Sequence, residues 1–413
     1  MKKRYAFAGS SSRALWMYAK PMASEELKDV TELCGVFDIN PGRAAEFVKI
    51  VGMDMPIYTD FDKMIEETKP DYVIVTTVDA YHSDYIIRAL ELGCNVITEK
   101  PMTTDENKCN AILEAKEKYG KEVIVTFNYR FAPFKTKIKE IIDSGVIGDI
   151  YSVHFEWLLD RVMKLGAHGA SYFRRWNARM AKSSGLLVHK STHHFDLVNW
   201  WIGQKPKRVS AFGKLNLYGA KNAKFQNTTR CCECPYAKEC EFYYEMTPLE
   251  LDYYKANEQY DGYWKDNCVY AEDIDIYDTM AVNVEYDGGA IMTYSLNATT
   301  AYEGWRIVIN GSGGRLEATE YESGFQSKVN EDVVKVFDLD DNCTEYHITR
   351  GGGGHGGGDQ RLRNMVFRDN VPDPLGHKAG TMDGAYSIIV GVAANKSIKE
   401  GKIIDIDDLL NRK

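Results

Sequence analysis

Five short apolar runs punctuate the first third of the chain, and amphipathic stretches with helical periodicity separate them, as at Tyr85, Ile86, Ala89 and Leu90. The runs cover residues 5–8, 33–37, 72–75, 95–98 and 123–127. Short strands that alternate with helices of this length are typical of βαβ units and a parallel sheet. The pattern therefore predicts an α/β fold, with a doubly wound, Rossmann-type domain over residues 1–127.

The rhythm changes after Asn128. A helical stretch at 134–144 precedes a series of strand-like segments with few helices between them, at 151–157, 209–212, 279–286, 290–296, 305–311, 314–317 and 333–337. Residues 287–289, Asp-Gly-Gly, predict a hairpin. We expect an α+β domain over residues 128–413, with a large, mostly antiparallel open sheet. Residues 218–269 are irregular and rich in tyrosine, and we expect an insertion folded over that sheet.

Charge and cysteine content narrow the function classes. The net charge is −9 and the pI is about 5.6, which argues against nucleic acid or an anionic membrane as partner. No apolar run approaches the length of a transmembrane helix. The nine cysteines are an odd number and mostly scattered, which favours a reducing compartment, and we infer the cytoplasm.

The turn after the first run is a degenerate dinucleotide fingerprint. Gly9, Ser11 and Ala14 stand at the three positions of G-x-G-x-x-G/A, with Ser12 and Arg13 between them. The glycine permits a tight turn, the small residues allow close approach of a pyrophosphate, and the following helix directs its N-terminus at the phosphates. An ordinary βα turn is the alternative for this motif taken alone.

Asp38 strengthens the dinucleotide interpretation. It ends the second apolar run, at the spacing of the acid that binds the ribose 2′-hydroxyl. A carboxylate there repels a 2′-phosphate, so we expect NAD rather than NADP. Arg43 follows closely and could weaken that preference. The alternative for Asp38 is a solvated turn residue.

Three further motifs identify a family. They are Val-Thr-Thr-Val-Asp-Ala-Tyr-His at 75–82, Thr-Glu-Lys-Pro at 98–101 and a histidine-rich segment at 185–196. Together these resemble the Gfo/Idh/MocA oxidoreductases, named after glucose–fructose oxidoreductase and inositol dehydrogenase. Residues 382–402 are similar to the family's closing helix, so the resemblance covers most of the chain.

The resemblance implies an NAD(P) domain, a C-terminal open-sheet domain and an active site between them. It implies that the cofactor contacts include Thr76, Thr77, His82, Glu99, Lys100 and Asn128, and that Tyr129 and Arg130 point toward substrate. It also implies a homo-oligomer, often built through the large sheet, and we expect a homodimer or homotetramer.

Catalysis is expected at Lys100 and His193. A lysine near a nicotinamide can have a lowered pKa, and a histidine titrates near neutrality and suits a base. His189 departs from the family frame, which has an acid there. It could serve as a second base, or His189 and Lys190 could bind a polar substrate. On one helix face, His189 and His193 could also hold a metal with a third ligand, although polar packing is the commoner role. Asp196 is expected to be structural.

Two other segments suggest binding. Cys231, Cys234 and Cys240 have the spacing C-x2-C-x5-C, which predicts a structural zinc or iron–sulfur site, with thiols that bind no metal as the alternative. The glycine-rich segment 351–358 contains only one other residue, His355. We expect a loop that closes on a sugar through His355, or else a flexible linker. Trp176, with arginines around it, is the aromatic residue we expect at the active site.

The leading hypothesis is an NAD-dependent oxidoreductase that acts on a hydroxyl carbon of a sugar, glycoside or polyol. One alternative is an NAD-dependent enzyme that cleaves glycosides through transient oxidation and elimination. Another is a non-catalytic sensor that binds NAD.

Overall fold

The computed structural model describes residues 2–225 and 229–411. Its first sheet has six parallel strands in the order β3-β2-β1-β4-β5-β6. Their bounds are Lys3–Ala8 (β1), Thr31–Phe37 (β2), Ile57–Tyr58 (β3), Tyr72–Val75 (β4), Asn95–Thr98 (β5) and Val123–Val125 (β6). All five predicted runs form strands. The sequence pattern missed β3, because it has two residues and neither is buried.

Helices connect these strands. They are the π-helical η1 (Ala14–Ala19) with α1 (Lys20–Ala23), α2 (Pro41–Val51), α3 (Phe61–Thr68), α4 (His82–Glu91) and α5 (Glu106–Tyr119). The side chains of Asn40, Asp60 and Asp105 cap α2, α3 and α5 by accepting a hydrogen bond from a main-chain N–H of the first turn. The doubly wound prediction is confirmed.

The second sheet has nine strands in the order β14-β13-β12-β11-β7-β10-β9-β8-β15. Only β7 and β10 pair in parallel, so the predicted mostly antiparallel sheet is confirmed. The strands are Ile150–Asp160 (β7), Pro206–Lys214 (β8), Thr279–Tyr286 (β9), Ile291–Thr300 (β10), Gly304–Gly311 (β11), Gly314–Tyr321 (β12), Glu331–Asp338 (β13), Cys343–Thr349 (β14) and Ile404–Asp405 (β15). The pattern missed β14, an edge strand without buried residues.

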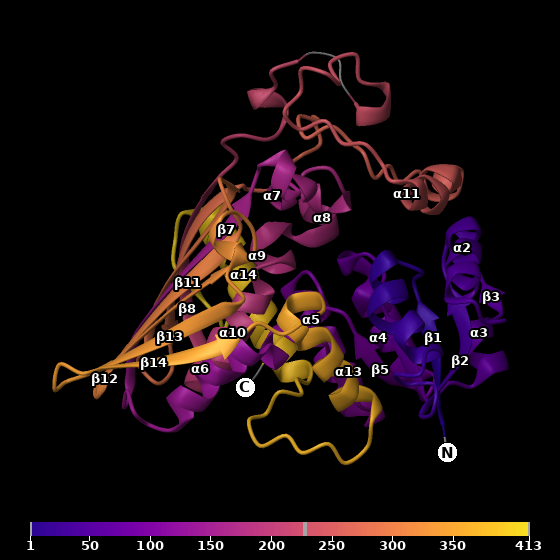
Figure 1. Cartoon of the computed structure of the whole chain (residues 1–413). Coiled ribbons are helices and arrows are strands. Elements are labelled where there is room, and N and C mark those ends of the chain that lie inside the picture. Colours follow the sequence, from indigo (N-terminus) through magenta and orange to yellow (C-terminus); the bar gives the residue numbers. More distant parts are fainter. Residues whose placement is uncertain (1, 226–228, 412–413) are drawn as a thin grey trace.

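One face of this sheet is covered by helices that lie between it and the dinucleotide domain (Figure 1). They include α6 (Pro133–Asp143), α9 (Gly185–His189), α10 (Thr192–Ile202) and α14 (Thr381–Glu400), beside the short α7 (His168–Ser171) and α8 (Met180–Ser183). Trp157, Trp201 and Trp305 are fully buried in this core. The histidine-rich segment therefore lies on the side of the sheet that faces the first domain.

Helix α13 (Gly358–Phe367) follows the sheet in sequence but packs into the first domain. Its Leu362 and Phe367 join the apolar cluster of Tyr5 and Tyr18, and Arg363 pairs with Glu26 at 2.7 Å. The first domain in the structure therefore includes α13 as well as the residues before the expected boundary at 127/128. Because α13 begins where the glycine-rich segment ends, this packing fixes that segment beside the dinucleotide site.

We had expected the insertion to fold over the sheet, but it does not. It extends from the end of the sheet to the first domain, where α11 (Pro248–Tyr253) and α12 (Glu258–Asp261) lie against α2 (Figure 1). Tyr253 and Tyr254 of this segment pack with the apolar cluster of the first domain that contains Tyr5 and Tyr18. Residues 226–228 of the insertion lie outside the described residues.

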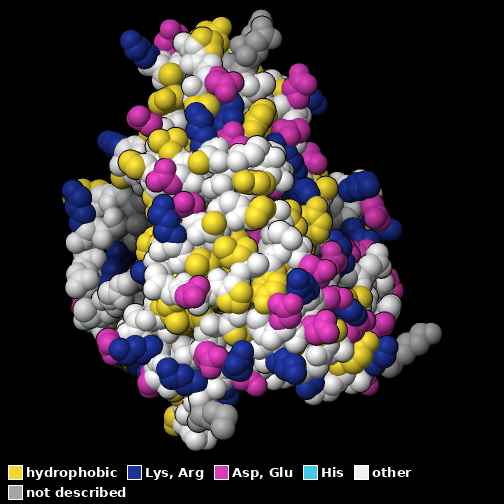
Figure 2. Space-filling model, turned by 90° about the vertical axis from the view of Figure 1, so that its right-hand side faces the viewer, with side chains coloured by type: hydrophobic (Ala, Val, Ile, Leu, Met, Phe, Trp, Pro, Cys, Tyr) yellow, Lys and Arg dark blue, Asp and Glu magenta, His cyan; other side chains and the backbone are white. Residues whose placement is uncertain are grey.

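Within the described ranges, no helix is long and apolar enough to cross a membrane. Viewed from the side of the dinucleotide domain, acidic and basic side chains are interspersed over the surface (Figure 2).

Candidate active site

The turn between β1 and the first helix requires glycine. Gly9 has φ +98°, and a Cβ there would lie 3.0 Å from the Thr77 nitrogen and 3.1 Å from main-chain atoms of Thr76. Ser11 Oγ accepts a hydrogen bond from the Ala14 N–H (3.1 Å), and Ser12 is exposed in the first helical turn. A bare glycine turn that opens a helix fits a pyrophosphate.

Asp38 lies beside this turn, at the end of β2. Its carboxylate accepts hydrogen bonds from the Ser10 N–H (2.7 Å), the Ser10 hydroxyl (2.6 Å) and the Asn40 N–H (2.8 Å). It is therefore not the solvated turn residue of the alternative interpretation: it is 7% exposed and holds the glycine turn against β2. This is the position that the ribose of a dinucleotide requires of an acid.

Arg43, which we had considered as a contact for a 2′-phosphate, is held by the insertion. Its guanidinium pairs with Asp261 at 2.7 Å and lies 5.5 Å and 5.7 Å from the ring centres of Tyr254 and Tyr263. The insertion also reaches the glycine turn itself, where the Tyr253 hydroxyl donates to the Ser10 carbonyl (2.5 Å). No pattern in the sequence predicted that residues 253–263 would contact the first domain.

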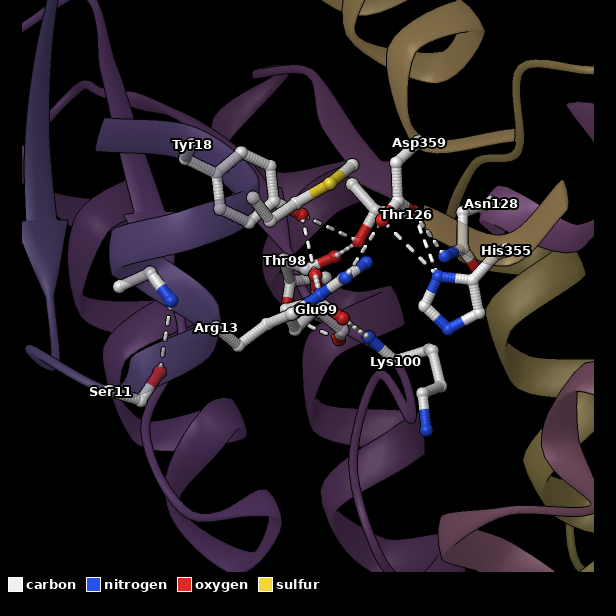
Figure 3. A network of polar contacts seen from close by, with 12 residues as sticks. Ser11, Arg13, Tyr18, Thr98, Glu99, Lys100, Thr126, Asn128, His355 and Asp359 are labelled. Carbon is white, nitrogen blue, oxygen red and sulfur yellow. Dashed lines mark hydrogen bonds and ion pairs between the residues drawn. The ribbon is translucent and has the colours of Figure 1, made fainter. Parts of the chain in front are cut away.

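Glu99 centres a buried network at the carboxyl end of β5 (Figure 3). It accepts from Arg13 Nε and from the Tyr18 hydroxyl, both at 2.7 Å. Arg13 also pairs with Asp359 of α13 at 3.4 Å. Burial favours a neutral Glu99, but Arg13 outweighs it and lowers the pKa of the carboxyl. Arg13 and Glu99 thus connect the dinucleotide turn to the start of α13.

His82 and Thr76 contact the main chain rather than the cleft. His82 Nδ1 lies 2.8 Å from the Pro101 carbonyl and Nε2 lies 3.1 Å from the Thr77 carbonyl. The Thr76 hydroxyl donates to the Gly9 carbonyl (2.8 Å). Both ring nitrogens of His82 therefore face main-chain carbonyls, one in each of the two segments that follow β4 and β5.

Lys100 lies where the two domains meet. Its ammonium donates to the His189 carbonyl (2.9 Å), and burial, together with the charge of Lys190, lowers its pKa to about 8. Asp79 Oδ2 lies 2.5 Å from His189 Nδ1 and Asn177 Nδ2 lies 3.0 Å from Nε2, so both ring nitrogens of His189 have a polar neighbour. Burial and Lys100 lower the pKa of His189 well below its ordinary value, so the ring is neutral.

Among the residues that the structure describes, none is a hydrogen-bond partner of His193 Nδ1, although that atom is buried. Its ring stacks on Tyr129, with ring centres 4.0 Å apart and planes 11° apart. Burial, followed by the charges of Lys100 and Lys190, lowers the pKa of His193 well below its ordinary value. The imidazole is therefore neutral at physiological pH and can accept a proton.

Lys190 lies next to this stack and points at Tyr129, whose hydroxyl accepts from the ammonium (3.2 Å). Burial disfavours its charge, but Tyr129, Tyr172 and Glu303 outweigh that effect and raise the pKa of Lys190 well above its ordinary value. The raised pKa keeps Lys190 charged beside the neutral His193.

The glycine-rich segment is ordered and reaches the same place. His355 has φ +53°, and its ring centre lies 5.6 Å from that of Tyr129 and 6.4 Å from that of His193. Asp359 lies 3.1 Å from His355 Nδ1 and accepts from Asn128 Nδ2 (2.6 Å) (Figure 3). Asn128 Oδ1 is buried and has no hydrogen-bond partner in the described part of the chain, so it remains available to a ligand amide or hydroxyl.

Arg130 does not point toward substrate. It is 2% exposed and forms a paired contact with Asp196 (2.8 Å and 2.6 Å), together with Asp383 (2.9 Å). This contact gives Asp196 the structural role we had expected of it. Trp176 does reach the site: its ring lies edge-on to His189 at 5.3 Å, and it is half-buried.

Neither expected metal arrangement is supported. Among residues 2–225 and 229–411, no group of three or more His, Cys, Asp or Glu side chains could hold a metal ion. Cys231, Cys234 and Cys240 border one small cavity, but Arg174 donates to Cys231 Sγ (3.1 Å), where a metal would compete with a cation. His189 ends α9 and His193 belongs to α10, so the two do not share a helix face.

Comparison with known proteins agrees with this architecture. Residues 3–127 match the model of an oxidoreductase family with an NAD-binding Rossmann fold. Residues 139–406 match that family's C-terminal alpha/beta domain. These matches define an oxidoreductase with a dinucleotide-binding domain. The chain belongs to the Gfo/Idh/MocA oxidoreductase family.

Individual relatives extend this result. A putative oxidoreductase of Bacillus subtilis, YteT, is 39% identical, with 98% of each chain covered. A D-glucoside 3-dehydrogenase of Escherichia coli is 30% identical over 42% of this chain and 47% of its own. A solved levoglucosan dehydrogenase in complex with NADH and levoglucosan shares the fold, with a TM-score of 0.68 at 18% identity over 98% of this chain and all of that one.

Proposed function

We propose that the protein oxidises a hydroxyl carbon of a sugar, glycoside or polyol with NAD as acceptor. The observation that carries this is a neutral His193, whose buried Nδ1 has no hydrogen-bond partner among the described residues and whose pKa is lowered by burial and then by the charge of Lys100. An alcohol needs one group that accepts its proton and another that stabilises the developing negative charge on oxygen. The names of relatives that act on glucosides and inositols support this substrate class.

In this proposal, the dinucleotide occupies the Gly9 turn, with its ribose at Asp38 and its nicotinamide end near Glu99, Lys100 and Asn128. A bound nicotinamide supplies the hydride acceptor. His193 accepts the hydroxyl proton, and Lys100 donates a hydrogen bond to the same oxygen. His189, held by Asp79 and Asn177, positions Lys100 through its carbonyl and is not the base. Tyr129, Lys190, Trp176 and His355 contact the sugar.

NAD is preferred over NADP in this proposal. Asp38 occupies the ribose position with a carboxylate, and the ion pair with Asp261 withholds Arg43 from a 2′-phosphate. Lys265 of the insertion, whose ammonium lies 4.3 Å from the Tyr254 ring centre, is held by Glu250 at 2.8 Å.

A scan of sugars, methyl glycosides and inositols for NADH formation tests the proposal, with NAD binding measured separately by fluorescence. We expect turnover of a hexose-like substrate. Folded protein that binds NAD but is silent across the panel would contradict it. Aglycone release without NADH would point to glycoside cleavage, and binding alone would point to a sensor.

We also infer that copies associate through the outer face of the large sheet. Phe212 on β8 and Ile291 on β10 are 79% and 54% exposed there, and exposed apolar strand positions favour association. Light scattering on the protein and on Phe212→Asp tests this.

A further inference from the structure

A second chamber lies beside the reaction site, on the far side of Tyr129. It has a volume of about 390 Å³ and is lined by the segment 129–135, the ends of β12 to β14 and the glycine-rich segment. This volume lies within the range of roughly 300–1,000 Å³ that is usual for small-molecule sites. Neither Lys100 nor His193 lines it, so it is separate from the place where the proton is transferred.

The ionic groups of the chamber are already paired. Lys135, 2% exposed, contacts Glu320 at 2.6 Å, and Arg350 contacts Asp332 at 2.6 Å. Within these two ion pairs, a charged ligand therefore meets no unpaired opposite charge. The same groups retain lone pairs and N–H bonds, and a ligand rich in hydroxyls, which both donate and accept, can use them.

Glu322 adds a neutral polar group. Its side chain is exposed and borders the chamber. The surrounding protein and the charges of Glu303 and Glu320 raise the pKa of Glu322, which favours the protonated carboxyl. A protonated carboxyl can donate as well as accept a hydrogen bond.

The chamber and the reaction site share a wall. Tyr129 and His355 line the chamber. On the side of the reaction site, the His193 ring stacks on Tyr129, with 4.0 Å between the ring centres. Aromatic side chains such as Tyr129 and Phe134 suit the apolar face of a ring. A ligand in the chamber is therefore separated from the proton acceptor by the thickness of one side chain.

We propose that this chamber binds a second, neutral sugar ring, joined to the ring that is oxidised. The inference rests on the proposed function and refines it: the preferred substrate is a neutral disaccharide or sugar-bearing glycoside, rather than a free monosaccharide or inositol.

Ile348→Trp tests the proposal by filling the chamber. Ile348 is half-exposed and lines it, and Thr344 lies on the same face of β14, outside the chamber, so Thr344→Trp is the matched control. For the wild type, we expect kcat/KM for a neutral disaccharide to exceed that for the matching methyl glycoside by about tenfold. Ile348→Trp should abolish this advantage and leave the methyl glycoside within about twofold. An equal loss for both substrates, or no loss, would overturn the proposal.

A binding measurement separates this proposal from the proposed function. Saturation-transfer NMR on Lys100→Met detects disaccharide binding without turnover, and Lys100→Met/Ile348→Trp should lose it. If the wild type oxidises no sugar but this loss is observed, the chamber is a sugar site and only the proposed oxidation fails. If sugars are oxidised but binding does not respond to Ile348→Trp, or no disaccharide binds at all, the chamber proposal fails.

Discussion

Lys100 donates a hydrogen bond from its ammonium to the main-chain carbonyl of His189, with 2.9 Å between the two atoms. The bond joins the loop after β5 to the end of α9, and so joins the dinucleotide domain to the domain that carries His193. Because the acceptor is main chain, the side chain of His189 could differ from the acid usual in the family without the loss of this contact.

Lys100→Met should lower kcat by about 10²–10⁴-fold, because it removes the cation that stabilises the substrate oxygen. NAD affinity, measured by fluorescence titration, should change far less. Lys108→Met is the control, since Lys108 also donates to a main-chain carbonyl, that of Ala80, at 2.9 Å. Wild-type turnover by Lys100→Met would exclude this role and favour a sensor.

The pH profile should report both groups. His193 must be neutral to accept a proton. On the acid side, kcat/KM for oxidation should therefore fall as the pH drops through the pKa of His193, which lies well below its ordinary value. Lys100 must be charged, so kcat/KM should also fall as the pH rises through about 8. Lys100→Arg should remove the alkaline limb, because arginine stays protonated. A rise in activity through pH 8 would instead make Lys100 the base.

Asp261→Ala should shift cofactor preference toward NADP. It releases Arg43, which pairs with Asp261 at 2.7 Å, so that the guanidinium can meet a 2′-phosphate. We expect the ratio of kcat/KM for NAD to that for NADP to fall by about tenfold, equivalent to ~1.4 kcal/mol. Asp252→Ala, an exposed acid of the same insertion, should leave the ratio unchanged. An unchanged ratio in Asp261→Ala would show that Asp38 alone sets the preference.

The sequence predicted the parts of the molecule that depend on local periodicity. The strands of the first sheet and most of those of the second could be identified because buried strands are continuous apolar runs or alternate strictly. Lys100 and His193 could be identified from the family motifs. The contacts between distant segments could not, because nothing in residues 253–261 encodes a partner at Ser10 or Arg43. For the same reason Asp79, Asn177 and Asp359 were missed, and Arg130 was misplaced although Asp196 was correctly taken as structural.

Arg130→Met should destabilise the fold rather than impair substrate binding. It leaves Asp196 buried without its partner, at a cost of about 3–5 kcal/mol. Burial already raises the pKa of Asp196 to about 6 despite Arg130. We therefore expect a lower thermal midpoint, measured by calorimetry, and an unchanged KM for sugar in the protein that remains folded. A raised KM at an unchanged midpoint would instead return Arg130 to the substrate site.

His355→Ala should impair the use of sugar without weakening the binding of NAD. His355 lines the chamber together with Tyr129, and Asp359 fixes its orientation through Nδ1, which leaves Nε2 for a substrate hydroxyl. The loss of one hydrogen bond to a polar substrate costs about 0.5–1.5 kcal/mol, so kcat/KM should fall by roughly 2- to 13-fold. His347→Ala, an exposed histidine on β14, is the control. An intact kcat/KM in His355→Ala would mean that the glycine-rich segment serves only to place Asp359 against Arg13 and Asn128.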